Sequence, residues 1–89
     1  MVVKFCSNGD ILEIDPDKGN KLSLELMQKH VDGYIEMVFL PKNKIMICNE
    51  EGMIKQLPIN ERATMLHAAI GGVTPIHGDV LVVDSFHID

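Results

Sequence analysis

The run Val80-Leu81-Val82-Val83 constrains the fold more than any other feature of the sequence. Four consecutive apolar β-formers show no alternation between a buried and a solvent-facing side, so they predict an inner strand that is covered on both faces. A chain of 89 residues has room for only one hydrophobic core. We therefore expect a single domain, residues 1–89, built around this strand.

Turn signals divide the rest of the chain into short elements. Asn8-Gly9 is the strongest hairpin signal, because both central positions of such a turn need positive φ. The expected strands cover residues 2–6, 11–14, 34–40, 45–48 and 80–83. Segment 53–57 fits either extended chain or a further strand, and Pro58 ends it.

Two stretches have apolar residues at helical spacing. The first predicts a helix over about 21–31 with Asn20 as its N-cap, and the second predicts one over about 61–70 with Asn60 as its N-cap. Gly71-Gly72 ends the second helix. Because strands and helices are segregated rather than strictly alternating, we expect an α+β fold: a small, mostly antiparallel sheet of about five strands with two short helices in a single layer.

Charge and cysteine content restrict the class of function. Lys and Arg total 8 and Asp and Glu total 13, a net charge of −5, which argues against direct binding of nucleic acid or of an anionic membrane. No apolar run approaches the roughly 18 residues of a membrane span, and the N-terminus does not resemble a signal peptide. Cys6 and Cys48 have apolar neighbours, so we interpret them as buried thiols in a reducing compartment and expect a cytoplasmic location. A single disulfide or a reactive thiol is the alternative.

The sequence offers no clear pattern for a metal, a cofactor or a nucleophile. The histidines have no ligand spacing, and neither a CxxC nor an HExxH motif occurs. Asp15-Pro16-Asp17 begins like a calcium loop, but Asn20 and Leu26 stand where that loop needs Gly and a carboxylate. We expect no metal and no cofactor, and we rank catalysis below binding.

Three polar clusters are candidate ligand-binding sites. Tyr34 and Glu36 share one face of a strand, residues 49–52 form a turn, and Arg62, the only Arg in the chain, stands at a helix start. An Arg beside free N–H groups can bind an anion such as phosphate. The candidate ligand-binding residues are Tyr34, Glu36, Asn49, Glu50, Asn60 and Arg62. Each cluster also has a purely structural interpretation: an exposed sheet face, a turn and a capped helix start.

The chain resembles the family catalogued as domain of unknown function 3846 in four ordered motifs: GYIE at 33–36, CNEEG at 48–52, LPIN-ER at 57–62 and I-GD-LVV at 76–83. It departs from the family at Ile59, where a second Pro is more common, and at Ile76-His77, where an apolar residue usually precedes the Gly. The family occurs in bacteriophages, plasmids and bacterial genomes, so the resemblance implies a mobile-element origin. It implies no established activity.

Three functional hypotheses follow. The first is a non-enzymatic accessory binding protein of phage or plasmid type, acting in counter-defence by sequestering a nucleotide-like or phosphorylated small ligand. The second is a protein–protein inhibitor of a host nucleic-acid or defence enzyme. The third is a small hydrolase with Glu36 or Glu50 as its general base. Convergence of the candidate residues in one pocket would favour a ligand, and scatter would favour a protein partner.

Two further expectations concern assembly and the candidate surface. The thin core expected at this length and the six methionines predict a homodimer or higher homo-oligomer. We expect Arg62 and the Asn49–Gly52 turn to belong to one functional surface. The alternative is that Arg62 pairs with Glu50 or Glu51 and only steadies the turn.

Overall fold

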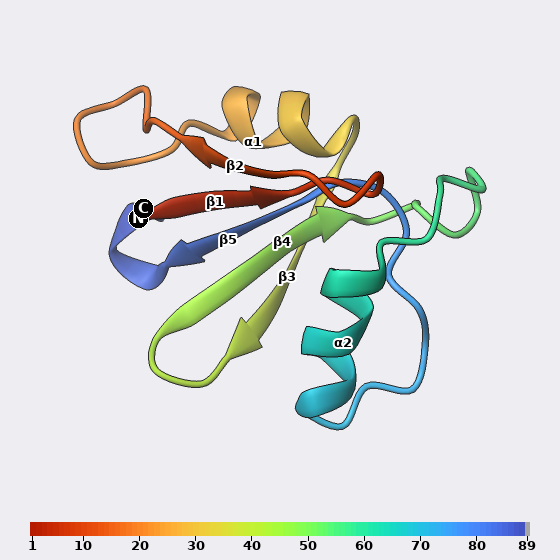
Figure 1. Cartoon of the computed structure of the whole chain (residues 1–89). Helices are drawn as coiled ribbons and strands as arrows, with labels where there is room; N and C mark the ends of the chain where they lie inside the picture. Colours follow the sequence, from red (N-terminus) through yellow and green to blue (C-terminus); the bar gives the residue numbers. More distant parts are fainter. Residues whose placement is uncertain (89) are drawn as a thin grey trace.

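The computed structural model describes residues 1–88 and contains a five-stranded sheet in which every neighbouring pair of strands is antiparallel (Figure 1). The strands are β1 (Val2–Phe5), β2 (Ile11–Ile14), β3 (Ile35–Leu40), β4 (Lys44–Asn49) and β5 (Val80–Asp84). Their order across the sheet is β2-β1-β5-β4-β3. β5 is therefore the central strand, and Val80, Leu81 and Val83 are completely buried. The predicted inner strand and the α+β class are both confirmed.

Two helices cover the sheet, one on each face. α1 (Leu24–Val31) packs on one hydrophobic cluster and α2 (Glu61–Ala69) on the other, and a short 3₁₀ helix, η1 (Ser85–His87), follows β5 (Figure 1). Neither α-helix, nor any other helix within residues 1–88, is long and apolar enough to cross a membrane.

The sequence of β4 explains why both faces are covered. Ile45 and Ile47 belong to the cluster under α1, whereas Met46 and Cys48 belong to the cluster under α2. A strand that is apolar on both sides needs a cover on each side. The predicted single layer of helix is therefore wrong.

α1 begins three residues later than the sequence predicted. Its N-cap is Ser23, not Asn20: the Ser23 hydroxyl accepts a hydrogen bond from the Leu26 N–H at 3.1 Å. The carboxylate of Asp17 fixes this cap, because it accepts hydrogen bonds from the Ser23 hydroxyl at 2.5 Å and the Ser23 N–H at 2.8 Å. These two bonds lower the pKa of Asp17. Asp32, in the left-handed region at φ 63°, ends the helix.

The connection between β4 and α2 is a series of turns rather than extended chain or a strand. The Lys55 N–H donates to the Glu51 carbonyl at 2.9 Å, and the Leu57 N–H donates to the Gly52 carbonyl at 3.0 Å. Gln56 has a positive φ of 56°, which ends any extended path. The extended or strand interpretation of 53–57 is therefore wrong. In contrast, α2 begins where predicted, with Asn60 as its N-cap.

Charged groups at the end of β5 hold the N-terminus and β4 together. The carboxylate of Asp84 accepts from the N-terminal ammonium group at 3.0 Å and from the Lys44 ammonium group. Two hydrogen bonds lower the pKa of Asp84 to about 2, and the bond from Lys44 has a larger effect than the bond from the N-terminus.

We predict that replacing Ser23 with Ala lowers the free energy of unfolding by about 1 kcal/mol, the usual cost of losing an N-cap. Asn20→Ala is the matched control, because the Asn20 side chain makes no hydrogen bond within residues 1–88. Urea unfolding followed by far-UV circular dichroism measures both. An equal loss for the two variants would contradict the assignment of Ser23 as the cap.

We also predict an acid-dependent contribution from Asp84. Its pKa in the folded chain is about 2, below the model-peptide value of 3.8, so the folded state favours the ionised carboxylate. This stabilisation is complete above the unfolded pKa and is lost as pH falls from about 4 towards 2. Asp84→Asn should therefore be less stable than the parent at pH 7, and most of this difference should be gone at pH 2. Exposed Asp15→Asn should match the parent at both pH values.

Candidate functional site

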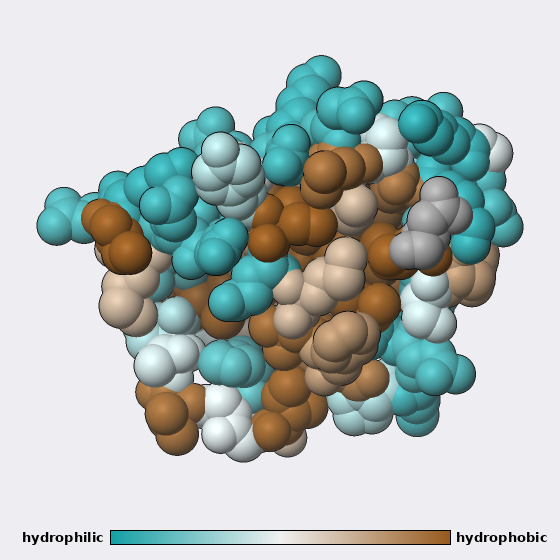
Figure 2. Space-filling view, turned by 180° about the vertical axis from the view of Figure 1, so that it is seen from behind, coloured by the Kyte–Doolittle hydropathy of each residue, from teal (hydrophilic) through white to brown (hydrophobic). Residues whose placement is uncertain are grey.

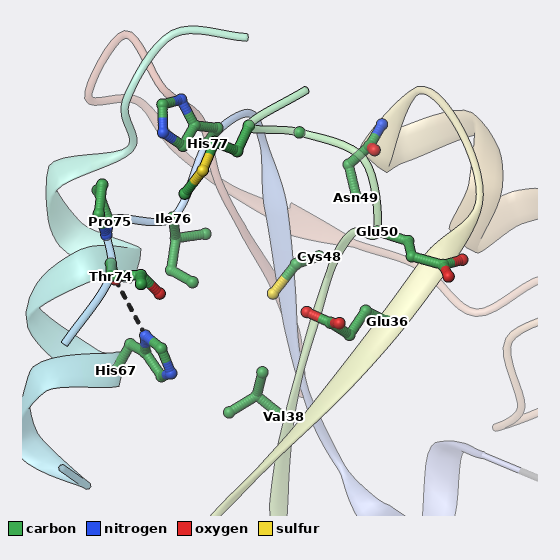
Figure 3. A pocket seen from close by; sticks show the side chains of 12 residues that line it. Glu36, Val38, Cys48, Asn49, Glu50, His67, Thr74, Pro75, Ile76 and His77 are labelled. Carbon is green, nitrogen blue, oxygen red and sulfur yellow. Dashed lines mark hydrogen bonds between the residues drawn. The ribbon is translucent and has the colours of Figure 1, made fainter. Parts of the chain in front are cut away.

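A cavity of about 170 Å³ lies between the β3–β4 hairpin, α2 and the loop that leads into β5 (Figure 3). We call it the Glu36 pocket; its lining includes the side chains of Glu36, Val38, Cys48, His67, Thr74 and Ile76, and the segments 49–53 and 75–77 also border it. Figure 3 shows the carboxylate of Glu36 and the sulfur of Cys48 facing His67 and Thr74 across the cavity.

Strand pairing brings Glu36 and Cys48 together. The two residues lie directly opposite each other on β3 and β4, so their side chains share the face that α2 covers. Burial, with a further contribution from the charge of Glu36, raises the pKa of the Cys48 thiol to about 12. The thiol is therefore neutral at physiological pH and is a poor nucleophile. Both cysteines are free thiols, so the disulfide alternative is wrong.

Two histidines complete the wall opposite the sheet. His67 Nδ1 lies 3.2 Å from the Thr74 carbonyl oxygen, and His77 Nδ1 lies 2.7 Å from the Leu57 carbonyl oxygen. A carbonyl oxygen only accepts, so each Nδ1 carries a proton, and in the neutral form of either ring Nε2 is the hydrogen-bond acceptor. From the sequence alone, these histidines are candidates only for metal binding. No periodicity or spacing places them beside Glu36.

Two glycines let the chain close around the pocket. A Cβ atom on Gly72 would lie 2.4 Å from ring atoms of His67, and a Cβ atom on Gly52 would lie 2.7 Å from the His77 carbonyl oxygen. A larger residue at position 72 would displace the His67 ring, and one at position 52 would push against the backbone of His77. The Gly72 N–H also donates to the His67 carbonyl at 2.8 Å. These contacts keep the His67 ring against the loop.

Two of the predicted site residues, Asn49 and Glu50, contribute differently from Glu36. Asn49 is buried, and its amide nitrogen donates to the carbonyls of Val31 and Asp32 at 3.0 and 3.1 Å. Its amide oxygen accepts from the Glu51 N–H at 2.7 Å. Asn49 thus ties the end of α1 to the end of β4. Figure 3 shows the Glu50 carboxylate directed away from the cavity.

Asn60 has a similar structural role in a different place. Its amide nitrogen donates to the carbonyls of Phe5 and Gly78 at 2.8 and 2.9 Å, and its amide oxygen accepts from the Ala63 N–H at 3.1 Å. All of its hydrogen-bonding groups are engaged inside the protein, and the residue is 1% exposed. Asn60 therefore joins β1, the start of β5 and α2.

Arg62 and Tyr34 lie outside the Glu36 pocket. Arg62 places its guanidinium 5.6 Å from the centre of the Phe5 ring and lines a separate cavity of about 290 Å³ beside the β1–β2 turn. Glu51 pairs with Lys55 at 4.0 Å rather than with Arg62. Tyr34 is 65% exposed and lines neither cavity. The structure thus brings Glu36, Asn49 and Glu50 together and does not bring Arg62 to the turn that follows β4.

Within residues 1–88, no group of three or more His, Cys, Asp or Glu side chains is arranged to hold a metal ion. The Glu36 pocket offers a different set of groups: the Glu36 carboxylate, the imidazoles of His67 and His77, and the Thr74 hydroxyl. The carboxylate, the hydroxyl and a neutral imidazole can each accept a hydrogen bond.

The fold and the pocket together define a small α+β protein with a narrow acceptor-lined cavity at one end of its sheet. The chain belongs to the family described as domain of unknown function 3846, whose family model matches residues 6–87. The match extends the resemblance seen at 33–83 to nearly the whole chain. No curated protein and no solved structure shows a significant match.

We predict that Asn60→Ala costs about 3 kcal/mol of folding free energy, because it removes the helix cap and leaves two buried carbonyls without their donor. Asn60→Ser keeps a capping oxygen and should recover about 1 kcal/mol of the loss. Chemical denaturation of both variants measures the difference. A loss below 1 kcal/mol for Asn60→Ala would contradict the role as a tether.

Proposed function

We propose that this protein is a non-enzymatic binding module that contacts a protein partner and accepts one arginine side chain of that partner in the Glu36 pocket. The observation that carries the proposal is the Glu36 carboxylate, which faces the cavity and forms no ion pair within residues 1–88. Glu36 is an exposed residue, so a cationic group can reach its carboxylate from solvent and pair with it.

The size of the cavity supports a side chain rather than a whole metabolite. Pockets for drug-sized ligands usually measure about 300–1,000 Å³, whereas this one measures about 170 Å³. A nucleotide would not fit inside it. The terminal group of one arginine is small enough to enter, with the rest of the partner lying on the surface outside.

The chemistry of the wall supports a guanidinium group in particular. Guanidinium carries five N–H donors and no acceptor. The pocket presents the complementary acceptors on Glu36, on Nε2 of His67 and on the hydroxyl of Thr74. Glu50 also lines the pocket, but its carboxylate is directed away from the cavity. An anionic group would meet the Glu36 carboxylate here, so the pocket disfavours phosphate.

Exposed apolar side chains beside the pocket support a protein partner. Val73, which directly precedes Thr74, is 95% exposed, and Ile54, next to the pocket residue Met53, is 80% exposed. An interface usually combines a buried anchor such as Arg with apolar contacts around it. The net charge of −5 would also speed association with a basic partner.

The biological setting is part of the same proposal. A mobile-element origin would place the protein in the cytoplasm of a host cell. Enzymes that act on nucleic acids carry basic binding surfaces, so an acidic module with an arginine pocket would suit occlusion of such a surface on a host defence enzyme. We therefore favour counter-defence through a protein partner over sequestration of a small ligand.

The two other hypotheses have less support. The phosphorylated-ligand hypothesis needed Arg62, Asn49 and Glu36 around one ligand, but Arg62 lines a different cavity and the Asn49 amide is engaged internally. The hydrolase hypothesis needs Glu36 or Glu50 as a general base, but the Glu50 carboxylate is directed away from the cavity, and the protonated thiol beside Glu36 adds no nucleophile.

The test is an NMR titration of the isotope-labelled protein with N-acetylarginine amide. We expect amide shifts at Glu36, His67 and Thr74 with a Kd on the order of millimolar, about 4 kcal/mol of binding free energy. N-acetylcitrulline amide, which has the same shape without the charge, should bind at least tenfold more weakly. Glu36→Gln should abolish the response, and the exposed Glu13→Gln should retain it.

Two outcomes would contradict the proposal. Equal binding of the arginine and citrulline probes would remove the role of the Glu36 charge. Shifts confined to residues 7–9 and Arg62 on addition of inorganic phosphate, without any response to the arginine probe, would instead support the anionic-ligand hypothesis.

A further inference from the structure

β3 is an edge strand whose outer side has no partner within residues 1–88. Its sequence, Ile35–Leu40, is IEMVFL and lacks the Lys, Pro or Gly residues that usually protect an edge from pairing. The opposite edge strand, β2, has only four residues against six in β3, and each of the two strands carries one glutamate. β3 is therefore the edge better suited to pairing with another strand.

The hydrogen bonding of β3 identifies the backbone groups on its free side. The Glu50 N–H donates to the Tyr34 carbonyl at 2.9 Å, so residues 34 and 50 form a hydrogen-bonded pair. Hydrogen-bonded and non-hydrogen-bonded pairs alternate along an antiparallel ladder. The N–H and C=O groups of Ile35, Met37 and Phe39 therefore point away from β4, toward the free side of the strand.

The side chains of the same three residues lie on the face that α1 covers. Ile35 and Met37 pack on the α1 cluster, whereas Phe39, beyond the end of the helix, is 72% exposed. Figure 2, which views the molecule from behind, shows apolar side chains gathered in the middle of this face. A hollow of about 360 Å³ lies next to Ile35. Its apolar lining is Leu22, Leu24, Met27, Ile35, Met37 and Ile88.

We propose that a second copy of this chain docks on β3, with the two β3 strands antiparallel about a two-fold axis at Met37. Met37 then faces the partner's Met37, and Ile35 faces the partner's Phe39. All three outward-facing residues of each strand exchange hydrogen bonds with the other strand. The two sheets become one sheet of ten strands, five from each copy.

The shape of the α1 face fits this arrangement. Directly opposed residues in an antiparallel pair point to the same face of the sheet. The partner's Phe39 would therefore stand beside Ile35, at the edge of the hollow, and each copy would offer one exposed ring and one hollow. The two-fold axis makes the interface self-complementary, as a closed dimer requires.

The positions of Glu36 and Pro41 favour this register over the two registers that are shifted by one hydrogen-bonded pair. A shift of one hydrogen-bonded pair in one direction would place Glu36 opposite the partner's Glu36, and like charges directly opposed are destabilising. A shift in the other direction would place Ile35 opposite Pro41, which has no N–H to donate. With the axis at Met37, Glu36 faces Val38 of the partner instead.

This inference does not depend on the proposed function, because the Glu36 pocket opens on the opposite face of the sheet. In the dimer the two pockets lie on one face, on either side of the axis. One dimer would then offer two arginine sites to a partner.

Analytical ultracentrifugation tests the proposal. At ~100 µM protein, within the range where weak dimers form, we expect twice the monomer mass. Phe39→Lys should weaken dimerisation at least 100-fold, because it removes the ring and puts a charge on the paired edge. Ile54→Lys, which also changes an exposed apolar residue, should leave the dimer intact.

Cross-linking tests the register. Met37→Cys should form an intermolecular disulfide under mild oxidation, because the axis brings the two residue-37 Cα atoms to about 5.5 Å. Phe39→Cys should not, since residue 39 faces residue 35. A monomeric parent, or equal dissociation of the Phe39→Lys and Ile54→Lys variants, would overturn the proposal. Neither result decides the arginine titration, which measures binding at Glu36 on the α2 face of the sheet.

Discussion

Two neighbouring strands that are apolar on both faces are the constraint on which the rest of this structure depends. On β4 and β5, the side chains of Ile47 and Leu81 lie on one face of the sheet, and those of Met46 and Val80 lie on the other face. Neither side can face water, so each must be covered. α1 covers one side closely. α2, of which only Ala63 is buried, covers the other side less completely, and the gap between α2 and the β3–β4 hairpin becomes the Glu36 pocket.

Two buried asparagines hold these covers in place. Asn49 binds the end of α1 to the end of β4, and Asn60 binds the start of α2 to β1 and to the segment before β5. Each amide satisfies three backbone groups that would otherwise be buried without a partner, which is costly. Residues that stand out in the sequence motifs therefore determine where the elements lie. Glu36 and Arg62, in contrast, form no ion pair within residues 1–88 and line separate cavities.

The alternation of β3 links the two proposals. Glu36 and Val38 point to the face of α2, whereas Ile35 and Met37 point to the face of α1. One six-residue strand thus supplies a charged pocket on one face and an apolar pairing surface on the other. The polarity of each face follows from a period of two in the sequence.

The sequence by itself determined the elements whose signals are local. The β3–β4 hairpin, the Asn60 cap, the inner strand at 80–83 and the hairpin at Asn8-Gly9 follow from turn signals and from short apolar runs. At the last of these turns only Gly9, and not Asn8, has the positive φ expected at both central positions. Tertiary contacts decided the rest. Asp17 hydrogen-bonds to Ser23 and makes it the N-cap of α1 in place of the predicted Asn20. The core has apolar clusters on both faces of the sheet, so one helix packs on each face. His67 and Thr74 meet Glu36 only because α2 and the loop before β5 fold back over the sheet. Such long-range contacts depend on packing between residues that are distant in the chain, and no local sequence pattern predicts them.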